Sequence, residues 1–587
     1  MRSILLSLLF AGISWQSSFA QNCDFSIAGR IMDISSKEVL PFVSIKIADT
    51  ELGTLSDSEG NFSFSELCEK EYDLIISVSG YKTITHHHDF HHDFIEIRLA
   101  PESYDLESVI IEAERAKTNI ESLAVQAIRG RDLEKISSGS LGDVASSIAG
   151  VSTISTGQNV VKPVIHGLHS NRILIINNGL RHEFQNWGID HAPEIDPSLI
   201  SSLQVVKGAA TVRYGSDALG GVILVDKAPV ELLSPLSGKV SLTGKSNGQS
   251  GEGSVELSKG FKWFGLYGGA SYIKQGDLHA AEYLLTNTGK EETGYYGGFR
   301  LHPIAELDIE GFYSHFEQEL GILQGSVFGN LDDLQRALDS EEPLYTDIFS
   351  YDIGQPFLTS SHDLYKAKAT FTKSNFSAQV QYGYQVNGRK EFGVRRGDAP
   401  NIDLVLKSES LDADIKHPNL GPLSGKLGFQ WMRQANDNLP GTNTVPFIPN
   451  YDSRRYGAYL IENLNWGNSI LELGLRYDNF EVDITGREPD NTIYRNILSY
   501  QNVTATLGYV QNFNDNHSFR TNIGTAWRPP NVAELYRFGQ HNFLLEYGLW
   551  RYTINEEFDF VTTSEGILTE EERPVPTEIG YKWINTY

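Results

Sequence analysis

The chain has 587 residues, enough for several domains, because a single hydrophobic core rarely grows beyond ~250–300 residues. Its formal net charge of −27 argues against nucleic acid and anionic lipid headgroups as ligands. Its 29 Phe, 27 Tyr, 8 Trp and 54 Gly, against 2 Cys and 3 Met, favour a transmembrane β-barrel, in which aromatic girdles and glycines are frequent.

The first twenty residues have the pattern of a secretory signal peptide. Arg2 supplies the positive end, residues 4–15 form a short apolar core, and Ser18 and Ala20 offer small side chains for cleavage before residue 21. After residue 20, no stretch approaches the ~18–20 consecutive apolar residues that a spanning helix needs. An exported chain of this kind is expected to be either soluble or a β-barrel.

Residues 21–100 alternate apolar and polar side chains between turn-forming clusters at 33–36 and 57–61. This pattern predicts a small β-sandwich. Both cysteines, Cys23 and Cys68, lie in this block. In an oxidising compartment, an even pair of cysteines within one small domain is most simply a disulfide.

A dense run of histidines occupies residues 86–92 of the same block. Imidazole binds Zn²⁺, Cu²⁺ and Ni²⁺, so His86 and His88 are candidate metal ligands. On a strand, however, alternate side chains point to opposite faces, which would halve the number of ligands on either side. A solvated surface is the alternative interpretation of the run.

Residues 101–118 are expected to form a linker. Its middle is short and β-branched, as a segment must be when it adds a strand to a partner protein through its free backbone. The alternative is that this segment forms the last strand of the sandwich. Its residues are Glu107, Ser108, Val109, Ile110, Ile111, Glu112 and Ala113.

From residue 230 to residue 587, segments of about ten residues alternate in polarity, as the strands of a membrane barrel do. In one of them, Val380 and Tyr382 are expected to face lipid, while Gln381 and Gln385 face the lumen. Residues 471–478 alternate in the same way. A soluble β-solenoid could also alternate, but it would not place its apolar face outward between Tyr and Trp ends, so a barrel is predicted.

Three motifs between residues 164 and 222 are the most informative feature of the chain. They read Val-Ile-His-Gly-Leu-His-Ser-Asn-Arg at 164–172, Val-Val-Lys-Gly at 205–208 and Tyr-Gly-Ser-Asp-Ala-Leu-Gly-Gly-Val at 214–222. In this order they resemble the plug domain of TonB-dependent outer-membrane receptors, although Ala209 replaces a usual Pro and His166 a usual Arg. The resemblance implies an α/β plug over residues 119–229 inside a large antiparallel transmembrane β-barrel over residues 230–587.

Other parts of the chain extend the resemblance. The Gly-Arg-Ile at 29–31, Gly-Asn-Phe at 60–62 and Ser-Gly-Tyr at 79–81 resemble the carboxypeptidase-regulatory-like domain that precedes the plug in receptors of Bacteroidetes type. The segment 107–113 resembles the TonB box, which pairs with the energy-coupling protein. The resemblance therefore implies a mainly β protein in the cell outer membrane, its N-terminal domain in the periplasm. Its partners would be membrane lipid and TonB with its inner-membrane energising complex.

The barrel of this family has 22 strands, whereas residues 230–587 provide for roughly 14–16 strands at the family's spacing. The Trp-Arg-Pro-Pro-Asn-Val-Ala-Glu-Leu-Tyr stretch at 527–536 resembles a mid-barrel motif of these receptors. An open barrel would leave an unpaired strand edge in lipid, which is costly. We therefore expect the sequence to lack the last several strands.

An Asp-His-Ala triplet at 190–192 in a plug loop resembles the zinc-uptake branch, whose plug contributes an Asp and a His to the metal. Carboxylate and imidazole are suitable Zn²⁺ ligands, so Asp190 and His191 are candidates. Hydrogen bonding within the loop is the alternative. Residues 535–541 resemble a stretch of the zinc receptors, which makes His541 the expected third ligand. Glu319, where a strand enters a loop, is a candidate fourth.

These features imply an active transporter that imports a metal ion or metal chelate, with zinc favoured and no cofactor required beyond Zn²⁺ bound as cargo. A siderophore or haem receptor is the alternative. A zinc carboxypeptidase-like enzyme is a remote one, suggested by the His-x-x-Glu of His191 and Glu194. The sequence contains neither a Gly-x-Ser-x-Gly elbow nor a His-Glu-x-x-His helix, so we expect no enzymatic activity.

Overall fold

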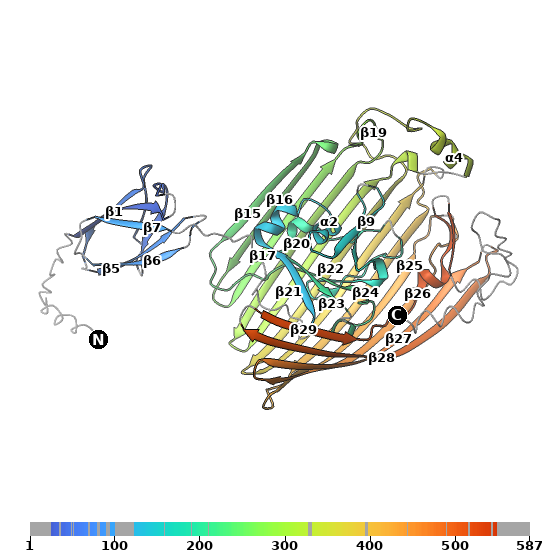
Figure 1. Ribbon diagram of the computed structural model, residues 1–587. Helices are drawn as coiled ribbons and strands as arrows, with labels where there is room; N and C mark the ends of the chain where they lie inside the picture. The colour runs from blue at the N-terminus through green and yellow to red at the C-terminus, as the bar shows by residue number, and fades with distance from the viewer. Residues whose placement is uncertain are drawn as a thin grey trace, which may run out of the picture. The chain divides into compact units, whose positions relative to one another are not determined.

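The computed structural model divides the chain into two compact units, residues 1–110 and residues 111–587. Figure 1 shows the described residues in colour. Among them, no helix is long and apolar enough to cross a membrane. The structure describes residues 25–34, 37–48, 50, 52–68, 71–78, 81, 83–89, 94–99, 122–157, 159–188, 191–208, 211–326, 331–393, 397–442, 444–488, 490–514, 517–541 and 544–548.

The first unit is a β-sandwich, which confirms the fold expected for this block. Its two sheets have the strand orders β4–β1–β7 and β3–β2–β5–β6. In β7, Ile95, Ile97 and Leu99 are buried, while Glu96 and Arg98 between them are exposed. The apolar faces of the two sheets share one core. The strands are β1 (Phe25–Asp33), β2 (Ser44–Ile47), β3 (Gly53–Leu55), β4 (Asn61–Leu67), β5 (Glu71–Ser77), β6 (Ile84–Asp89) and β7 (Ile95–Leu99).

Two groups of candidate residues lie in this unit. The histidines of β6 alternate between its two faces, because β6 is a strand. His86 shares a face with the buried His88, whereas His87 is exposed and its Nδ1 lies 2.8 Å from a carboxylate oxygen of β5. Cys68 is disulfide-bonded, and Cys23, the other cysteine of the chain, lies outside the described residues.

The second unit begins with an α/β domain, the plug, around a five-stranded sheet of order β12–β11–β14–β13–β8. Strands β13 and β14 are buried on both faces, which explains their near-continuous apolar sequences. Gly221 opens β14 at a φ of 144°, and a Cβ there would lie 2.5 Å from the Val206 carbonyl oxygen, so glycine is required. The elements are β8 (Ala124–Arg129), α1 (Gly130–Ile136), α2 (Leu141–Ser146), β9 (Val151–Ser155), β10 (Val161–Ile165), η1 (Ser170–Arg172), β11 (Leu174–Asn177), β12 (Leu180–Arg181), η2 (Pro197–Leu199), β13 (Ser202–Lys207), α3 (Thr211–Tyr214) and β14 (Gly221–Asp226).

The rest of the described chain forms a curved antiparallel sheet around the plug (Figure 1). Thirteen strands follow one another in sequence order from β15 to β29, with the short hairpin β18–β19 set apart. They are β15 (Ser237–Lys245), β16 (Ser250–Gly260), β17 (Phe264–Gln275), β20 (Lys290–Ile304), β21 (Leu307–Gly321), β22 (Phe357–Lys373), β23 (Phe376–Phe392), β24 (Ile402–Lys416), β25 (Leu423–Asn438), β26 (Asn450–Trp466), β27 (Ser469–Arg487), β28 (Ile493–Asn514) and β29 (His517–Gly524). The remaining elements are η3 (Asn247–Gln249), β18 (Leu278–His279), β19 (Leu284–Leu285), η4 (Gln324–Ser326), α4 (Leu331–Asp339), α5 (Val532–Tyr536), β30 (Phe538–His541) and β31 (Leu544–Tyr547).

The side chains of this sheet face as the alternation predicts. On β23, Val380 and Tyr382 are exposed on the outer face, whereas Gln381 and Gln385 are buried on the inner face. Residues 471–478 of β27 follow the same rule, with exposed leucines and a buried charged or small residue between them. The apolar face therefore points outward and the polar face inward, toward the plug. This is the arrangement of a membrane barrel and not of a soluble sheet.

Candidate functional site

The plug segment 179–185 lies along the inner face of β23 and is hydrogen-bonded to it at successive positions. The Gln385 side-chain amide donates to the carbonyl oxygen of Arg181 at 2.8 Å. Further along both segments, the backbone N–H of Gln185 donates to the Asn387 side-chain oxygen at 3.2 Å. Inward-facing side chains occur at every second residue of the strand, so they meet an extended plug segment at regular intervals. The inner face of β23 thus determines where this plug segment is placed.

His191, the predicted ligand of the plug loop that follows, is fully buried against β23. Its Nε2 lies 3.3 Å from Glu391 Oε1 near the end of β23, and its Nδ1 is hydrogen-bonded to the backbone carbonyl oxygen of Gln185. The Trp187 ring packs edge-on against the imidazole, with the two ring centroids 4.1 Å apart. Arg389 Nε donates to the same Glu391 oxygen at 2.7 Å. A carbonyl that holds Nδ1–H leaves Nε2 as the nitrogen that can coordinate, which is how metal-binding histidines are commonly oriented.

A second cluster, His182, Glu194 and His362, is buried between the plug and β22; we call it the histidine–glutamate cluster. His182 Nε2 lies 3.8 Å from Glu194 Oε2, and the two imidazole rings are 4.2 Å apart. Neither nitrogen of His182 has a hydrogen-bond partner, and Glu194 has none beyond its own residue. Burial lowers the pKa of His182 to about 3 and raises the pKa of Glu194. Such unpaired buried groups each cost about 1–3 kcal/mol, so the cluster requires an explanation.

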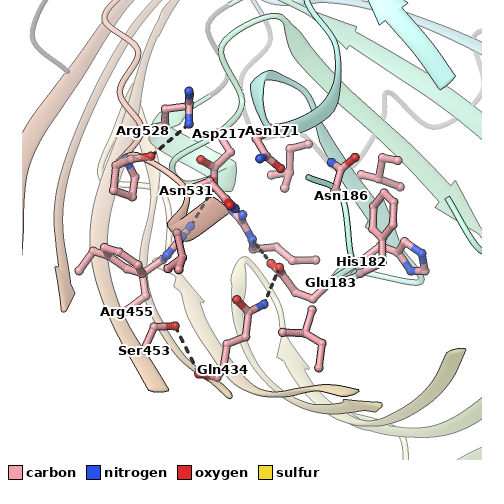
Figure 2. A pocket seen from close by; sticks show the side chains of 18 of the residues that line it. Asn171, His182, Glu183, Asn186, Asp217, Gln434, Ser453, Arg455, Arg528 and Asn531 are labelled. Atoms are coloured by element: carbon pink, nitrogen blue, oxygen red, sulfur yellow. Dashed lines mark hydrogen bonds and ion pairs between the residues drawn. The ribbon is translucent and has the colours of Figure 1, made fainter. Parts of the chain in front are cut away.

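A pocket of about 100 Å³ opens beside this cluster, between the plug, β24–β27 and residues 528–532. In Figure 2, Arg455 and Asn531 lie on one side of it and His182 on the other. Arg181 Nη2 and Arg455 Nη1 both donate to Asp217 Oδ2, at 2.7 and 3.0 Å. We call these three residues the arginine–aspartate latch, because Arg181 and Asp217 belong to the plug and Arg455 to β26.

The carboxylate of the latch is compensated by its two arginines, and Arg181 is also paired with Glu183, at 2.9 Å. Burial raises the pKa of Asp217, but the guanidinium groups of Arg455 and Arg181 outweigh that effect and hold its pKa below the ordinary value. The third arginine of the pocket, Arg528, makes a two-pronged ion pair with Glu534 of α5 at 2.7 and 2.8 Å. Each arginine of the pocket is therefore already paired with a carboxylate.

The structure brings together only part of the predicted ligand set. Asp190 and the segment 107–113 lie outside the described residues, and so does the side chain of His541, whose backbone belongs to β30. Within the described residues, no group of three or more His, Cys, Asp or Glu side chains is positioned to hold a metal ion as it stands. Of the two predicted plug ligands, His191 is thus the one whose surroundings can be described, and its neighbour Glu391 was not singled out from the sequence.

One expectation about the ligands is corrected. Glu319 lies within β21 on the outer face, the face of Tyr313, while its neighbour Gln318 is buried on the inner face. The strand's alternation therefore directs Glu319 away from the plug and from His191. The His-x-x-Glu pattern does not form a zinc pair either, because His191 contacts β23 whereas Glu194 lies against His182.

Comparison with known protein families accounts for most of the chain. Residues 27–111 match the CarboxypepD_reg-like domain, residues 119–222 the TonB-dependent receptor plug domain, and residues 320–555 the TonB-dependent receptor-like β-barrel. The three matches follow one another in the order that the sequence motifs indicate. They support a transporter family and not an enzyme family.

Solved structures share the fold. The chain is similar to the copper transporter OprC (17% identity, TM-score 0.56, 71% of this chain and 64% of that one). It is also similar to the ferric yersiniabactin uptake receptor FyuA from Yersinia pestis (13%, 0.51, 70% and 65%). A third match is the hemophore receptor HasR of Serratia marcescens, solved as a double mutant with its hemophore HasA and heme (14%, 0.57, 73% and 67%). The chain spans less than two thirds of the length of the first two of these.

The curved sheet with an apolar outer face, the α/β plug bound to its inner face and the three family matches lead to the same assignment. The chain is a TonB-dependent receptor with a CarboxypepD_reg-like domain, a plug and an outer-membrane β-barrel.

Proposed function

We propose that this receptor is an active transporter that imports a metal ion or a metal chelate across the outer membrane, with zinc as the favoured cargo. The observation that carries the proposal is the pair formed by His191 and Glu391. Two ligand atoms ~2.0–2.1 Å from a tetrahedral zinc ion lie about 3.3–3.4 Å from each other. The 3.3 Å between His191 Nε2 and Glu391 Oε1 matches that separation. Asp190 and His541 are the proposed further ligands.

In this proposal the plug segment beside β23 transmits the pull of TonB. TonB would pair with the segment 107–113 in the periplasm and draw on inner-membrane energy, and the N-terminal unit would lie in the periplasm as well. Arg181 accepts a single hydrogen bond from the Gln385 side-chain amide of β23, and the backbone N–H of Gln185 donates a single one to the Asn387 side-chain oxygen. Each contributes only ~1 kcal/mol, so they can be broken one after another as the plug is pulled. The cargo would then pass along the wall without any covalent chemistry.

A ferric siderophore or haem is the alternative cargo. The names of the similar structures include copper, ferric yersiniabactin and heme, which supports metal-containing cargo in general. The three arginines of the pocket would suit an anionic chelate, but each is already paired with Asp217 or Glu534. Free zinc is preferred because the His191–Glu391 pair provides two ligand atoms at a suitable separation.

Calorimetric titration of the purified chain in detergent with Zn²⁺ tests this proposal. We expect saturable binding that His191→Ala and Glu391→Gln each weaken at least tenfold, about 1.4 kcal/mol. His279→Ala is the matched control, because this exposed histidine of β18 lies away from the pair. If both variants bind zinc as tightly as the control does, the His191–Glu391 pair is not the site, and ferric chelates and haem become the cargo to titrate.

A further inference from the structure

The histidine–glutamate cluster has the composition of a metal site and lies apart from the His191–Glu391 pair. His182 and Glu194 come from the plug, and His362 comes from β22 of the barrel. The cluster is closed to solvent: the side chains of His182 and Glu194 are 0% exposed, and His362 is 2% exposed. Two imidazoles and one carboxylate are an established ligand set for zinc.

The orientation of His362 adds a second, independent observation. One of its ring nitrogens is hydrogen-bonded to the backbone of Glu183, and the other, Nε2, is buried without a partner. A backbone acceptor at Nδ1–H fixes the tautomer in which Nε2 carries the free lone pair. Nε2 of His362, Nε2 of His182 and the carboxylate of Glu194 therefore leave electron-pair donors unused in one buried place. A cation is the ligand that satisfies donors of this kind together.

We propose that the histidine–glutamate cluster binds a divalent transition-metal ion of the zinc type, as a site separate from the pair at the end of β23. His182 Nε2 and Glu194 Oε2 are 3.8 Å apart, slightly wider than the ~3.4 Å between ligands of a tetrahedral zinc ion, so a small side-chain rotation closes the site. The charge of the neighbouring Arg389 is balanced by Glu391, to which its Nε donates at 2.7 Å. Both carboxylate oxygens of Glu194 are buried without a side-chain hydrogen-bond partner.

The position of the cluster would let a bound metal ion hold the plug against the inner face of the barrel sheet. His362 pairs with Asn387 across β22 and β23, and Asn387 is four residues from Glu391. At ~3.3 Å per residue, the two sites are about 13 Å apart along β23. A metal ion held by plug and barrel ligands together would fasten the plug to β22.

Zinc titration of the full purified chain in detergent tests the inference, with His362→Gln as the main variant. We expect two classes of site in the wild-type protein. His362→Gln should lose one class and keep the class that His191→Ala removes. His362→Asp restores a ligand, so it should bind in the second class more tightly than His362→Gln. Because the two proposals concern different variants, the failure of one leaves the other testable.

Two further readouts separate metal binding from a merely structural effect. Co²⁺ should give the intense visible absorption of a tetrahedral site, and His362→Gln should reduce that absorption by about half. Zn²⁺ should slow amide exchange of plug peptide 179–187 in the wild type and not in His362→Gln. If His362→Gln binds Zn²⁺ and Co²⁺ with wild-type stoichiometry, or if Zn²⁺ leaves the exchange of 179–187 unchanged in both proteins, the cluster is not a metal site.

Discussion

The arginine–aspartate latch is expected to stabilise the closed plug, and Asp217→Asn removes its central charge with little other change. Asp217 has a φ of 79°, a left-handed conformation that Asn tolerates and that most other residues do not. Asn also keeps the shape of the side chain and one hydrogen-bond acceptor. The variant therefore isolates the loss of the charge from backbone strain and from a cavity.

The magnitude follows from the two ion pairs that meet at one oxygen. Asp217 Oδ2 accepts from Arg181 at 2.7 Å and from Arg455 at 3.0 Å, and its side chain is 15% exposed. Removing one partner of a buried ion pair costs ~3–5 kcal/mol, here because Arg455 loses its carboxylate, whereas Arg181 keeps its ion pair with Glu183. Partial exposure and the remaining acceptor reduce that cost to about 2–4 kcal/mol.

Amide hydrogen exchange in the plug measures this change in the free energy of plug opening. Opening of the plug should become easier by about 2–4 kcal/mol, so peptides that contain β11 and β12 should exchange about 30- to 700-fold faster. Asp398→Asn, in an exposed turn, removes the same charge away from the plug and should have no effect. If the exchange of β11 and β12 changes less than threefold in Asp217→Asn, the latch does not hold the plug closed.

Three further outcomes are expected. The pKa of Asp217 is held below its ordinary 3.8. The contribution of the latch to the stability of the closed plug is therefore complete above about pH 3.8 and is lost as the pH falls through the folded-state pKa. The exchange difference between wild type and Asp217→Asn should therefore shrink below that pH and stay constant above it. Leu473→Lys places a charge on the outer face of β27 and should cost ~2–4 kcal/mol of stability in lipid vesicles, measured by urea titration, whereas Leu420→Lys in an exposed turn should cost under ~1 kcal/mol. Gly221→Ala brings a Cβ to 2.5 Å from the Val206 oxygen and should increase exchange in β13 and β14, and unchanged protection there would contradict the need for glycine.

The fold could be predicted from the sequence because its signals are local. Alternation within β23 gives the facing of Val380 and Gln381 correctly, since the two-residue period of a strand needs no distant information. The plug motifs include Gly221, at a position whose backbone conformation and close neighbour require glycine. The bulk of the architecture follows from patterns of this kind.

The site could be predicted only in part, because its residues meet across the plug–wall contact. Glu391 is one of many charged residues on barrel strands, and its contact with His191 joins positions 200 residues apart. The same holds for His362, whose approach to His182 depends on which strand faces the plug. Glu319 was misplaced because both faces of β21 carry aromatic residues, so its sequence does not show which face is inward.

Uptake of radioactive zinc into cells that express the receptor tests the central claim most directly. The comparison is between the wild-type receptor and a variant that lacks residues 107–113, both inserted in the outer membrane at equal levels. The account predicts uptake by the wild type and background uptake by the deletion variant, while the purified deletion variant still binds zinc. Equal zinc uptake by the two, or none above background by either, would contradict TonB-driven import of zinc by this receptor.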